Sequence, residues 1–156
     1  MFGFLKRKTR EIKAPVDGES VVLESVNDEV FSSKMVGDGV AIIPMSDIFT
    51  APIDGIVSKI FPTNHAYSIK SPKDLEVMVH IGLETVALEG RGFERLAQEG
   101  QKVKAGDAII KADLSYIRVH AKDIITPIII LEESDVKNIE PRLTIVKSQD
   151  IIMEVS

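Results

Sequence analysis

A repeated turn motif constrains the fold more than any other feature of this sequence. Residues 14–18, Ala-Pro-Val-Asp-Gly, recur as residues 51–55, Ala-Pro-Ile-Asp-Gly, and a β-rich run follows each copy at 21–23 and 56–60. Proline ahead of an Asp-Gly pair is typical of turns between strands. The sequence therefore predicts an all-β fold, an antiparallel β-sandwich or barrel-sandwich with pseudo-symmetric halves.

Further glycine turns and apolar runs extend the β prediction along the chain. The glycine turns at 36–39 and 103–107 each lead into an Ala-Ile-Ile run. Additional strands are expected at 126–130, 143–146 and 151–153. The chain of 156 residues is long enough for one domain with a sizeable core.

Helix signals are few and short. Phe93, Leu96 and Ala97 have the i, i+3, i+4 spacing of a helix face and lie between Gly92 and Gly100. This spacing predicts one or two helical turns there. A second short helix is expected at residues 114–121, where Leu114, Ile117 and Ala121 recur at helical intervals.

Composition excludes several classes of function. Hydrophobic residues make up 44% and charged residues 28% of the chain, which is typical of globular proteins. The formal net charge of −5 argues against a nucleic-acid partner. The lack of cysteine removes thiol nucleophiles, cysteine-based metal sites and disulfides. Without a signal peptide, the expected location is the cytoplasm.

The N-terminal residues differ in character from the rest. We assign residues 1–11 to a basic tail and 12–156 to the functional domain. Residues 1–10 place Phe2, Phe4 and Leu5 before four cations. A frayed tail is the expected state, and weak contact with an anionic membrane surface through residues 1–10 is the alternative.

Two of the three histidines, His65 and His80, lie in apolar segments. Around His80 the residues alternate, so Leu75, Val77, Val79 and Ile81 are expected in the core, while Met78 and His80 occupy the opposite face. Two imidazoles on two strands indicate a candidate site, although spacing alone leaves structural and catalytic roles equally open.

The same alternation places Phe61, Thr63, His65 and Tyr67 on one side of the preceding strand, with the Thr63 hydroxyl close to the His65 ring. We assign no functional role to Tyr67. His120 stands apart from any second histidine or hydroxyl, and we expect it to be a surface or packing residue.

Common catalytic signatures are missing from the sequence. It contains no Walker-type phosphate loop, no Gly-x-Ser-x-Gly elbow and no His-Glu-x-x-His motif. Gly37 and Gly39 lead into a strand rather than a helix, so they do not form a dinucleotide fingerprint.

Four separated motifs carry a family resemblance. The motifs are residues 34–39 (Lys-Met-Val-Gly-Asp-Gly), 51–55, 63–69 (Thr-Asn-His-Ala-Tyr-Ser-Ile) and 79–86 (Val-His-Ile-Gly-Leu-Glu-Thr-Val), and the match around them runs from about Ile12 to the C-terminus. Together they resemble the glucose-type enzyme IIA of the bacterial phosphoenolpyruvate-dependent sugar phosphotransferase system.

This resemblance implies a phosphocarrier and assigns roles to particular residues. His80 matches the histidine that accepts a phosphoryl group on Nε2 from HPr and passes it to a cysteine of an enzyme IIB domain. His65 matches a supporting histidine, and Thr63 a residue that orients it. The implied partner-binding surface is an apolar collar with two acidic positions: Phe31, Val36, Phe61, Met78 and Val86, with Asp38 and Glu84.

The resemblance implies no required cofactor and leaves some points open. Regulatory protein targets are a further possible class of partner, and the choice of sugar belongs to the membrane component. His65 and His80 could supply two ligands to a zinc ion that a partner's carboxylate completes, although a zinc site normally has three or four protein ligands.

Two alternative functions were weighed. The Ala-Pro-x-Asp-Gly turns also resemble biotinyl or lipoyl carrier domains, but no Met-Lys-Met-like or Asp-Lys-Ala-like tripeptide with a modifiable lysine occurs. A zinc endopeptidase on a related β-scaffold would use a His-x-His pair, and residue 78 is Met.

Overall fold

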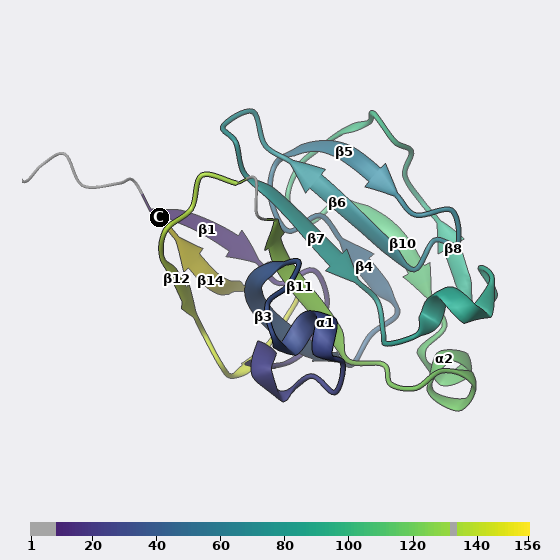
Figure 1. Cartoon of the computed structure of the whole chain (residues 1–156). Helices are drawn as coiled ribbons and strands as arrows, with labels where there is room; N and C mark the ends of the chain where they lie inside the picture. Colours follow the sequence, from purple (N-terminus) through teal and green to yellow (C-terminus); the bar gives the residue numbers. More distant parts are fainter. Residues whose placement is uncertain (1–8, 132–133) are drawn as a thin grey trace, which may run out of the picture.

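A computed structural model describes residues 9–131 and 134–156, and it is built from three antiparallel sheets (Figure 1). The eight-stranded sheet has the order β13-β2-β3-β11-β7-β6-β5-β9, with bounds Ile145–Val146, Gly18–Val22, Gly37–Pro44, Thr126–Leu131, Glu76–His80, Ala66–Lys70, Gly55–Ile60 and Lys102–Val103. The three-stranded sheets β1-β14-β12 and β4-β10-β8 comprise Arg10–Lys13, Ile151–Val155, Ile139–Pro141, Ile48–Thr50, Ala108–Ala112 and Phe93–Arg95. The all-β sandwich is confirmed.

The repeated pentapeptides form equivalent structures in the two halves. Asp17 Oδ1 accepts a hydrogen bond from the Ser148 N–H at 2.7 Å, and Asp54 Oδ1 accepts one from the Ala105 N–H at 2.8 Å. Each acceptor belongs to one copy of the repeat, and each donor belongs to a four-residue turn, at 147–150 or 104–107. The two copies of the repeat therefore make equivalent hydrogen bonds, as expected for pseudo-symmetric halves.

The two halves are also tied directly to each other. The Lys13 N–H donates to the Pro52 carbonyl at 2.9 Å, and the Thr50 N–H donates to the Pro15 carbonyl at 2.8 Å. Each strand entering one repeat is thus hydrogen-bonded to the other repeat. This exchange joins both halves around one interior.

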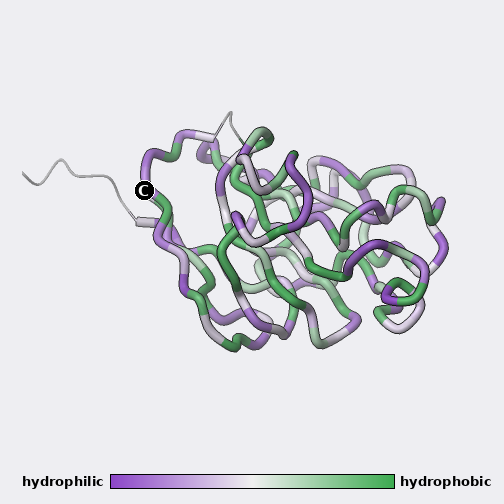
Figure 2. Tube along the Cα trace, turned by 60° about the horizontal axis from the view of Figure 1, so that its bottom comes forward, coloured by the Kyte–Doolittle hydropathy of each residue, from purple (hydrophilic) through white to green (hydrophobic). Residues whose placement is uncertain are grey.

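The central strands of the eight-stranded sheet, such as β11 and β6, are buried on both faces. The inward face of this sheet contributes Val79 and Ile128 to a main core shared with the smaller sheets, whereas Ile129 faces a second, smaller core. We define the second core by its buried members: Leu23, Val26, Phe31, Ala41, Met78, Leu83, Ile125 and Ile129. Figure 2 shows apolar segments running through the middle of the molecule and hydrophilic ones in the peripheral loops.

Short helices cover the second core and the ends of the sheets. They are η2 Leu23–Ser25, α1 Glu29–Ser32, η3 Thr85–Leu88 and α2 Leu114–His120. The predicted helix at residues 114–121 is confirmed by α2. Asp28 precedes α1 as its N-cap and accepts a hydrogen bond from the Val30 N–H at 3.0 Å.

The helix predicted around residues 93–97 is wrong. Phe93–Arg95 forms β8, which pairs with β10, and the Leu96 N–H donates to the Ile109 carbonyl at 2.8 Å. Of the three predicted core positions only Ala97 is buried, whereas Leu96 is 41% exposed. Pairing with a distant strand satisfies the backbone of this segment and overrides its local helical spacing.

The N-terminal predictions fall largely outside the structure. The membrane contact proposed for residues 1–10 rests on residues 1–8, which lie outside the described part, whereas Arg10 and Glu11 belong to β1 and pair with β14. Within residues 9–131 and 134–156, the helices are too short to span a bilayer.

Candidate active site

His80 ends strand β7, and the predicted alternation of that strand is confirmed. Leu75, Val77, Val79 and Ile81 lie in the main core, while Met78 belongs to the second core and His80 is half-buried beside it. Because β7 is paired on one side with β6 and on the other with β11, its register is fixed. His80 is thereby held at a defined place on the second-core face.

His65 comes directly before β6 and meets His80 across the strand pair. Ala66 is the register partner of His80, and the Ile81 N–H donates to the His65 carbonyl at 2.7 Å. The two imidazole rings lie edge to face, with centroids 4.9 Å apart and planes at 78°. Two histidines 15 residues apart in sequence therefore form one pair.

The segment that carries His65 is a turn rather than the predicted strand. The Asn64 N–H donates to the Phe61 carbonyl at 2.7 Å, and Asn64 adopts a left-handed backbone with φ of 61°. Tyr67 consequently faces the main core, where its hydroxyl donates to the Thr50 carbonyl at 2.7 Å. The predicted proximity of Thr63 is correct, since its Oγ1 lies 2.5 Å from His65 Nδ1.

The protonation of the His80 ring follows from a backbone carbonyl. His80 Nδ1 lies 2.8 Å from the Gly82 oxygen, which can only accept a hydrogen bond, so Nδ1 carries the proton. In the neutral ring Nε2 then retains its lone pair. Gly82 reaches this position with φ of 76°, and a Cβ there would lie 2.8 Å from the Asp123 carbonyl oxygen.

Burial favours the neutral form of both histidines at pH 7. Burial, followed by the neighbouring His80, lowers the pKa of His65 to about 4. Burial also lowers the pKa of His80, an effect that the Gly82 carbonyl and the nearby Asp28 carboxylate oppose. Asp28 is thus linked to His80 electrostatically as well as capping the adjacent helix.

The predicted apolar collar lies mainly in the second core. Phe31 packs on His80 with ring centroids 4.8 Å apart, and Phe61 packs edge-on to His65 at 5.4 Å. Met78 is buried in this core and Val36 packs against it. Val86, in η3, is instead 56% exposed.

The two acidic positions named from the sequence lie at the surface beside lysines. Asp38 on β3 is 3.4 Å from the Lys34 ammonium, and Glu84 is 3.9 Å from the Lys122 ammonium. Side chains of all four residues are well exposed, so these pairs add little to stability and can exchange for charges on another molecule.

Comparison with known proteins identifies the family. The model for the phosphoenolpyruvate-dependent sugar phosphotransferase system, EIIA 1, matches residues 10–136. The "PTS system glucose-specific EIIA component" of Haemophilus influenzae is 48% identical over 132 residues, covering 83% of this chain and 80% of the relative. That of Staphylococcus epidermidis is 42% identical and covers 100% of this chain and 96% of the relative.

The chain belongs to this EIIA family. The solved structure "glucose permease IIA from Mycoplasma capricolum" agrees, with a TM-score of 0.91, 37% identity and 99% of each chain covered. The protein is thus a phosphotransferase-system EIIA component, a phosphocarrier in sugar uptake. The carrier-lysine and zinc-endopeptidase alternatives are set aside, and the family requires no cofactor.

Sequence patterns did not assign Gly82 and Asp28 to the surroundings of His80, although both influence its ring. Gly82 contributes a carbonyl bonded to His80 Nδ1, and Asp28 contributes a nearby negative charge, neither of which alternation along a strand predicts. Asp28 carried a local signal, because an Asn-Asp-Glu run before an apolar pair is typical of a helix N-terminus. The position of Gly82 was visible in the sequence, but the direction of its carbonyl was not.

His120 lies in α2 and contacts its own helix. Its Nδ1 is 2.9 Å from the Tyr116 carbonyl, and its ring stacks on Tyr116 with centroids 4.1 Å apart. This agrees with the packing role expected from the sequence. Across the described ranges, no three or more His, Cys, Asp or Glu side chains gather in a way that could hold a metal ion.

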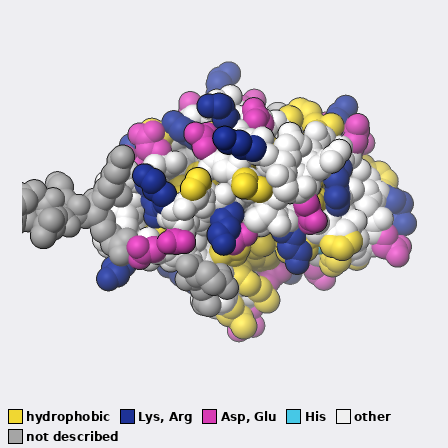
Figure 3. Space-filling model, turned by 90° about the horizontal axis from the view of Figure 1, so that it is seen from above, with side chains coloured by type: hydrophobic (Ala, Val, Ile, Leu, Met, Phe, Trp, Pro, Cys, Tyr) yellow, Lys and Arg dark blue, Asp and Glu magenta, His cyan; other side chains and the backbone are white. Residues whose placement is uncertain are grey.

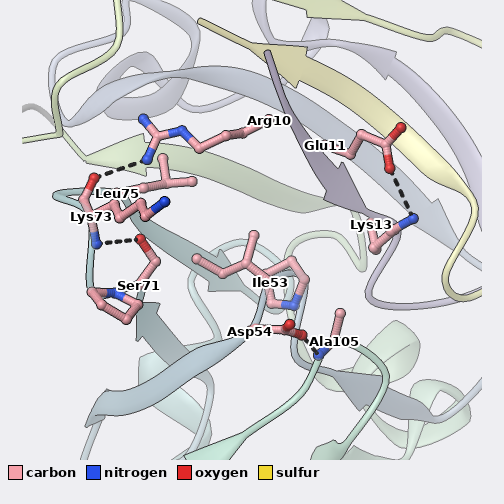
Figure 4. Close-up of a pocket in the computed structure, with 11 residues that line it drawn as sticks. Arg10, Glu11, Lys13, Ile53, Asp54, Ser71, Lys73, Leu75 and Ala105 are labelled. Carbon is pink, nitrogen blue, oxygen red and sulfur yellow. Dashed lines mark hydrogen bonds and ion pairs between the residues drawn. The ribbon is translucent and has the colours of Figure 1, made fainter. Parts of the chain in front are cut away.

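The EIIA fold also has a pocket of about 450 Å³ away from the histidines. Figure 4 shows Arg10 of β1 above Leu75 and Ile53, with Lys13 of the same strand to the right, and the Arg10 guanidinium donates to the Lys73 carbonyl at 2.9 Å. Leu75 precedes β7 and His80 ends it, a separation of roughly 17 Å along an extended strand. The pocket is therefore not part of the histidine site.

The face turned upward in Figure 1 likewise does not present the site. Figure 3 shows lysine, arginine and acidic side chains interspersed on that face, and no histidine is visible there among the described residues. The histidine pair instead lies at the opposite end of β7, next to α1.

Proposed function

We propose that His80 is the phosphoryl carrier of this EIIA component, accepting the group from HPr and passing it to a cysteine of an enzyme IIB domain. The observation that carries the proposal is the hydrogen bond from His80 Nδ1 to the Gly82 carbonyl. It leaves Nε2 as the free nucleophilic nitrogen of a neutral ring. The lowered pKa of His80 keeps that lone pair available at pH 7.

The proposed reaction consists of two displacements at phosphorus. His80 Nε2 forms a bond to phosphorus while the N–P bond of phospho-HPr breaks and its electron pair returns to the HPr ring nitrogen. In the second displacement the IIB thiolate attacks phosphorus, and the N–P electron pair returns to His80 Nε2. Each step conserves the phosphoryl group, and the Gly82 carbonyl stabilises the Nδ1 proton while the ring carries the group.

We assign His65 the role of stabilising charge on the moving phosphoryl oxygens. Thr63, 2.5 Å from Nδ1, can donate its hydroxyl proton there, which leaves the proton of neutral His65 on Nε2. The edge-to-face arrangement with His80 then brings an N–H donor next to the carrier ring. A donor directed at developing charge typically contributes about 10²–10³ in rate.

The collar of Phe31, Phe61, Val36, Met78 and Val86 is proposed as the partner-binding surface. Packing of Phe31 and Phe61 on the two imidazoles limits the access of water, which would otherwise hydrolyse the phosphohistidine. Exposed Asp38 and Glu84 supply negative charge at the rim for basic residues of HPr. Two successive partners favour a modest interface that dissociates quickly.

The wider setting follows from the relatives. Since these are named glucose-specific, we infer a glucose-type sugar pathway, with the sugar selected by the membrane component. A cytoplasmic location completes the proposal, with regulatory proteins as a further class of partner. For residues 1–10 a frayed tail stays the expected state, and weak contact with an anionic membrane surface is the alternative. A partner-shared zinc on His65 and His80 would need at least one ligand from the partner and would occupy His80 Nε2, so it would block phosphorylation.

Single-turnover measurements on three variants test this assignment. His80→Gln should lose phosphoryl acceptance because the amide has no nucleophilic nitrogen. His65→Gln should still accept phosphate from HPr but pass it to enzyme IIB about 10²–10³-fold more slowly. His120→Gln, which alters a histidine outside the pair, should behave like the parent protein. An acid-labile phosphate retained on His80→Gln would place the carrier elsewhere.

A further inference from the structure

The turn at residues 61–65 positions Thr63 and His65. Few backbone hydrogen bonds within the turn stabilise it. Its internal bonds run from the Asn64 N–H to the Phe61 carbonyl and from the Phe61 N–H to the Ala66 carbonyl at 2.9 Å. Asn64 has the left-handed φ of 61°, a conformation that is uncommon outside glycine and that asparagine tolerates better than most residues. Thr63 and His65 flank this residue directly, so a change at Asn64 would move both.

An arginine from a distant strand holds this turn from outside. The Arg95 guanidinium donates to Asn64 Oδ1 from two nitrogens, Nε at 3.0 Å and Nη2 at 2.8 Å. Arg95 belongs to β8, where it is the register partner of Ile110 on β10, so its backbone is fixed by the sheet. The two N–H groups of the Arg95 guanidinium, called here the fork, thus connect a paired strand to the left-handed residue between Thr63 and His65.

A second contact from the same segment holds the start of the turn. Glu99 Oε2 accepts a hydrogen bond from the Ile60 N–H at 2.8 Å. Ile60 is the last residue of β5, and its side chain is in the main core. The chain from β8 to Glu99 therefore meets the turn at both its entry and its left-handed residue.

We propose that Arg95, acting through the Asn64 side chain, is a positioning residue for His65. The proposal rests on the function assigned to His65 above. Two N–H donors of one planar guanidinium converge on the Asn64 oxygen and fix its position, and a lysine ammonium lacks this rigid pair of donors. Holding Asn64 in turn keeps Thr63 Oγ1 on His65 Nδ1 and keeps the His65 ring buried against His80.

Two variants separate the bond from the backbone conformation. Asn64→Gly preserves the left-handed turn, because glycine adopts positive φ freely, but it removes the acceptor oxygen. Arg95→Lys preserves the charge but removes the fork. Each should slow onward transfer to enzyme IIB by roughly 3- to 10-fold, the factor that corresponds to one hydrogen bond of ordinary strength. Arg91→Lys, an exposed arginine that contacts Tyr116 and Glu89 instead, is the matched control.

A ring-nitrogen NMR titration of His65 reports the position of the ring independently of the transfer rate. Loosening the turn exposes the ring, so the pKa of His65 should rise from about 4 toward the ordinary 6.5 in Asn64→Gly and Arg95→Lys but not in Arg91→Lys. The double variant Asn64→Gly/Arg95→Lys should be no slower than the slower single variant, since both remove the same bond.

The His65→Gln background distinguishes failure of this inference from failure of the proposed function. If His65 acts in transfer, Arg95→Lys should add no further loss to His65→Gln. If His65→Gln itself transfers normally, the proposed function fails, while a shifted His65 titration still supports positioning by Arg95. An unchanged His65 titration in both Asn64→Gly and Arg95→Lys would overturn the inference whatever the transfer rates.

Discussion

At the level of single residues, the two site histidines differ through their immediate neighbours. His80 Nδ1 faces a backbone carbonyl, whereas His65 Nδ1 faces a hydroxyl that can donate to it. His65 is also the more deeply buried of the two, with 4% of its surface exposed. These neighbours leave Nε2 of His80 with a free lone pair and Nε2 of His65 with an N–H that can donate a hydrogen bond.

The buried His65 makes stability depend on pH. Its folded-state pKa of about 4 lies below the ordinary 6.5, so the unfolded chain binds more protons between these values. The stabilisation is fully present above about pH 6.5 and is lost as the pH falls toward 4. We expect the free energy of unfolding to fall by about 2–3 kcal/mol over this range from His65 alone.

Urea unfolding of the parent protein and His65→Gln at pH 7 and pH 4 measures this contribution. Glutamine does not titrate, so the variant should lose less stability on acidification by about the same 2–3 kcal/mol. All other titrating groups, including His80, are shared by the two proteins. Equal losses in both proteins would mean that His65 is not held neutral by the fold.

At the level of elements, helix α1 packs on His80 through its residue Phe31, and Asp28 is the N-cap of this helix. Asp28→Ala should lower the free energy of unfolding by about 1 kcal/mol through loss of the N-cap. It should also lower the pKa of His80 further, because the carboxylate that favours the imidazolium is gone. Asp28→Ser, which keeps a capping oxygen without charge, should recover the stability but not the pKa.

Urea midpoints and an NMR titration of His80 on the two variants check this pair of effects. Recovery of the His80 pKa in Asp28→Ser would show that the cap, and not the charge, sets it. Equal midpoints for Asp28→Ala and Asp28→Ser would remove the capping role.

The same elements explain what could be predicted from sequence. Strand β7 was predictable because strict alternation identifies both faces and therefore the face that carries His80. The turn at 61–65 and strand β8 were not, because Asn64 and Phe93–Arg95 are held by partners more than 10 residues away. Four motifs sufficed to identify the family. The direction of the Gly82 carbonyl and the hydrogen bonds from Arg95 to Asn64 depend on the folded arrangement and could not be predicted from the sequence.

At the level of the whole molecule, the two copies of the repeat stabilise the sandwich from equivalent positions. Asp17 is half-buried and Asp54 exposed, so Asp17→Ala should lower the free energy of unfolding by about 1–2 kcal/mol and Asp54→Ala by about 0.5–1 kcal/mol. Each aspartate binds a different turn, so the effects should add within about 0.5 kcal/mol in the double variant. Urea unfolding of the three variants tests this, and a larger discrepancy would mean that the halves are coupled through these contacts.

The central claim is that the phosphoryl group resides on Nε2 of His80. The test uses protein labelled with ¹⁵N in its histidine rings. After phosphorylation by phosphoenolpyruvate, enzyme I and HPr, the ring nitrogen and phosphorus NMR signals are recorded. We expect one phosphohistidine, in which phosphorus is coupled to Nε2 of His80 and the Nδ1 proton is retained against the Gly82 carbonyl. Phosphorus coupled to Nδ1 of His80, or to either nitrogen of His65, would contradict it.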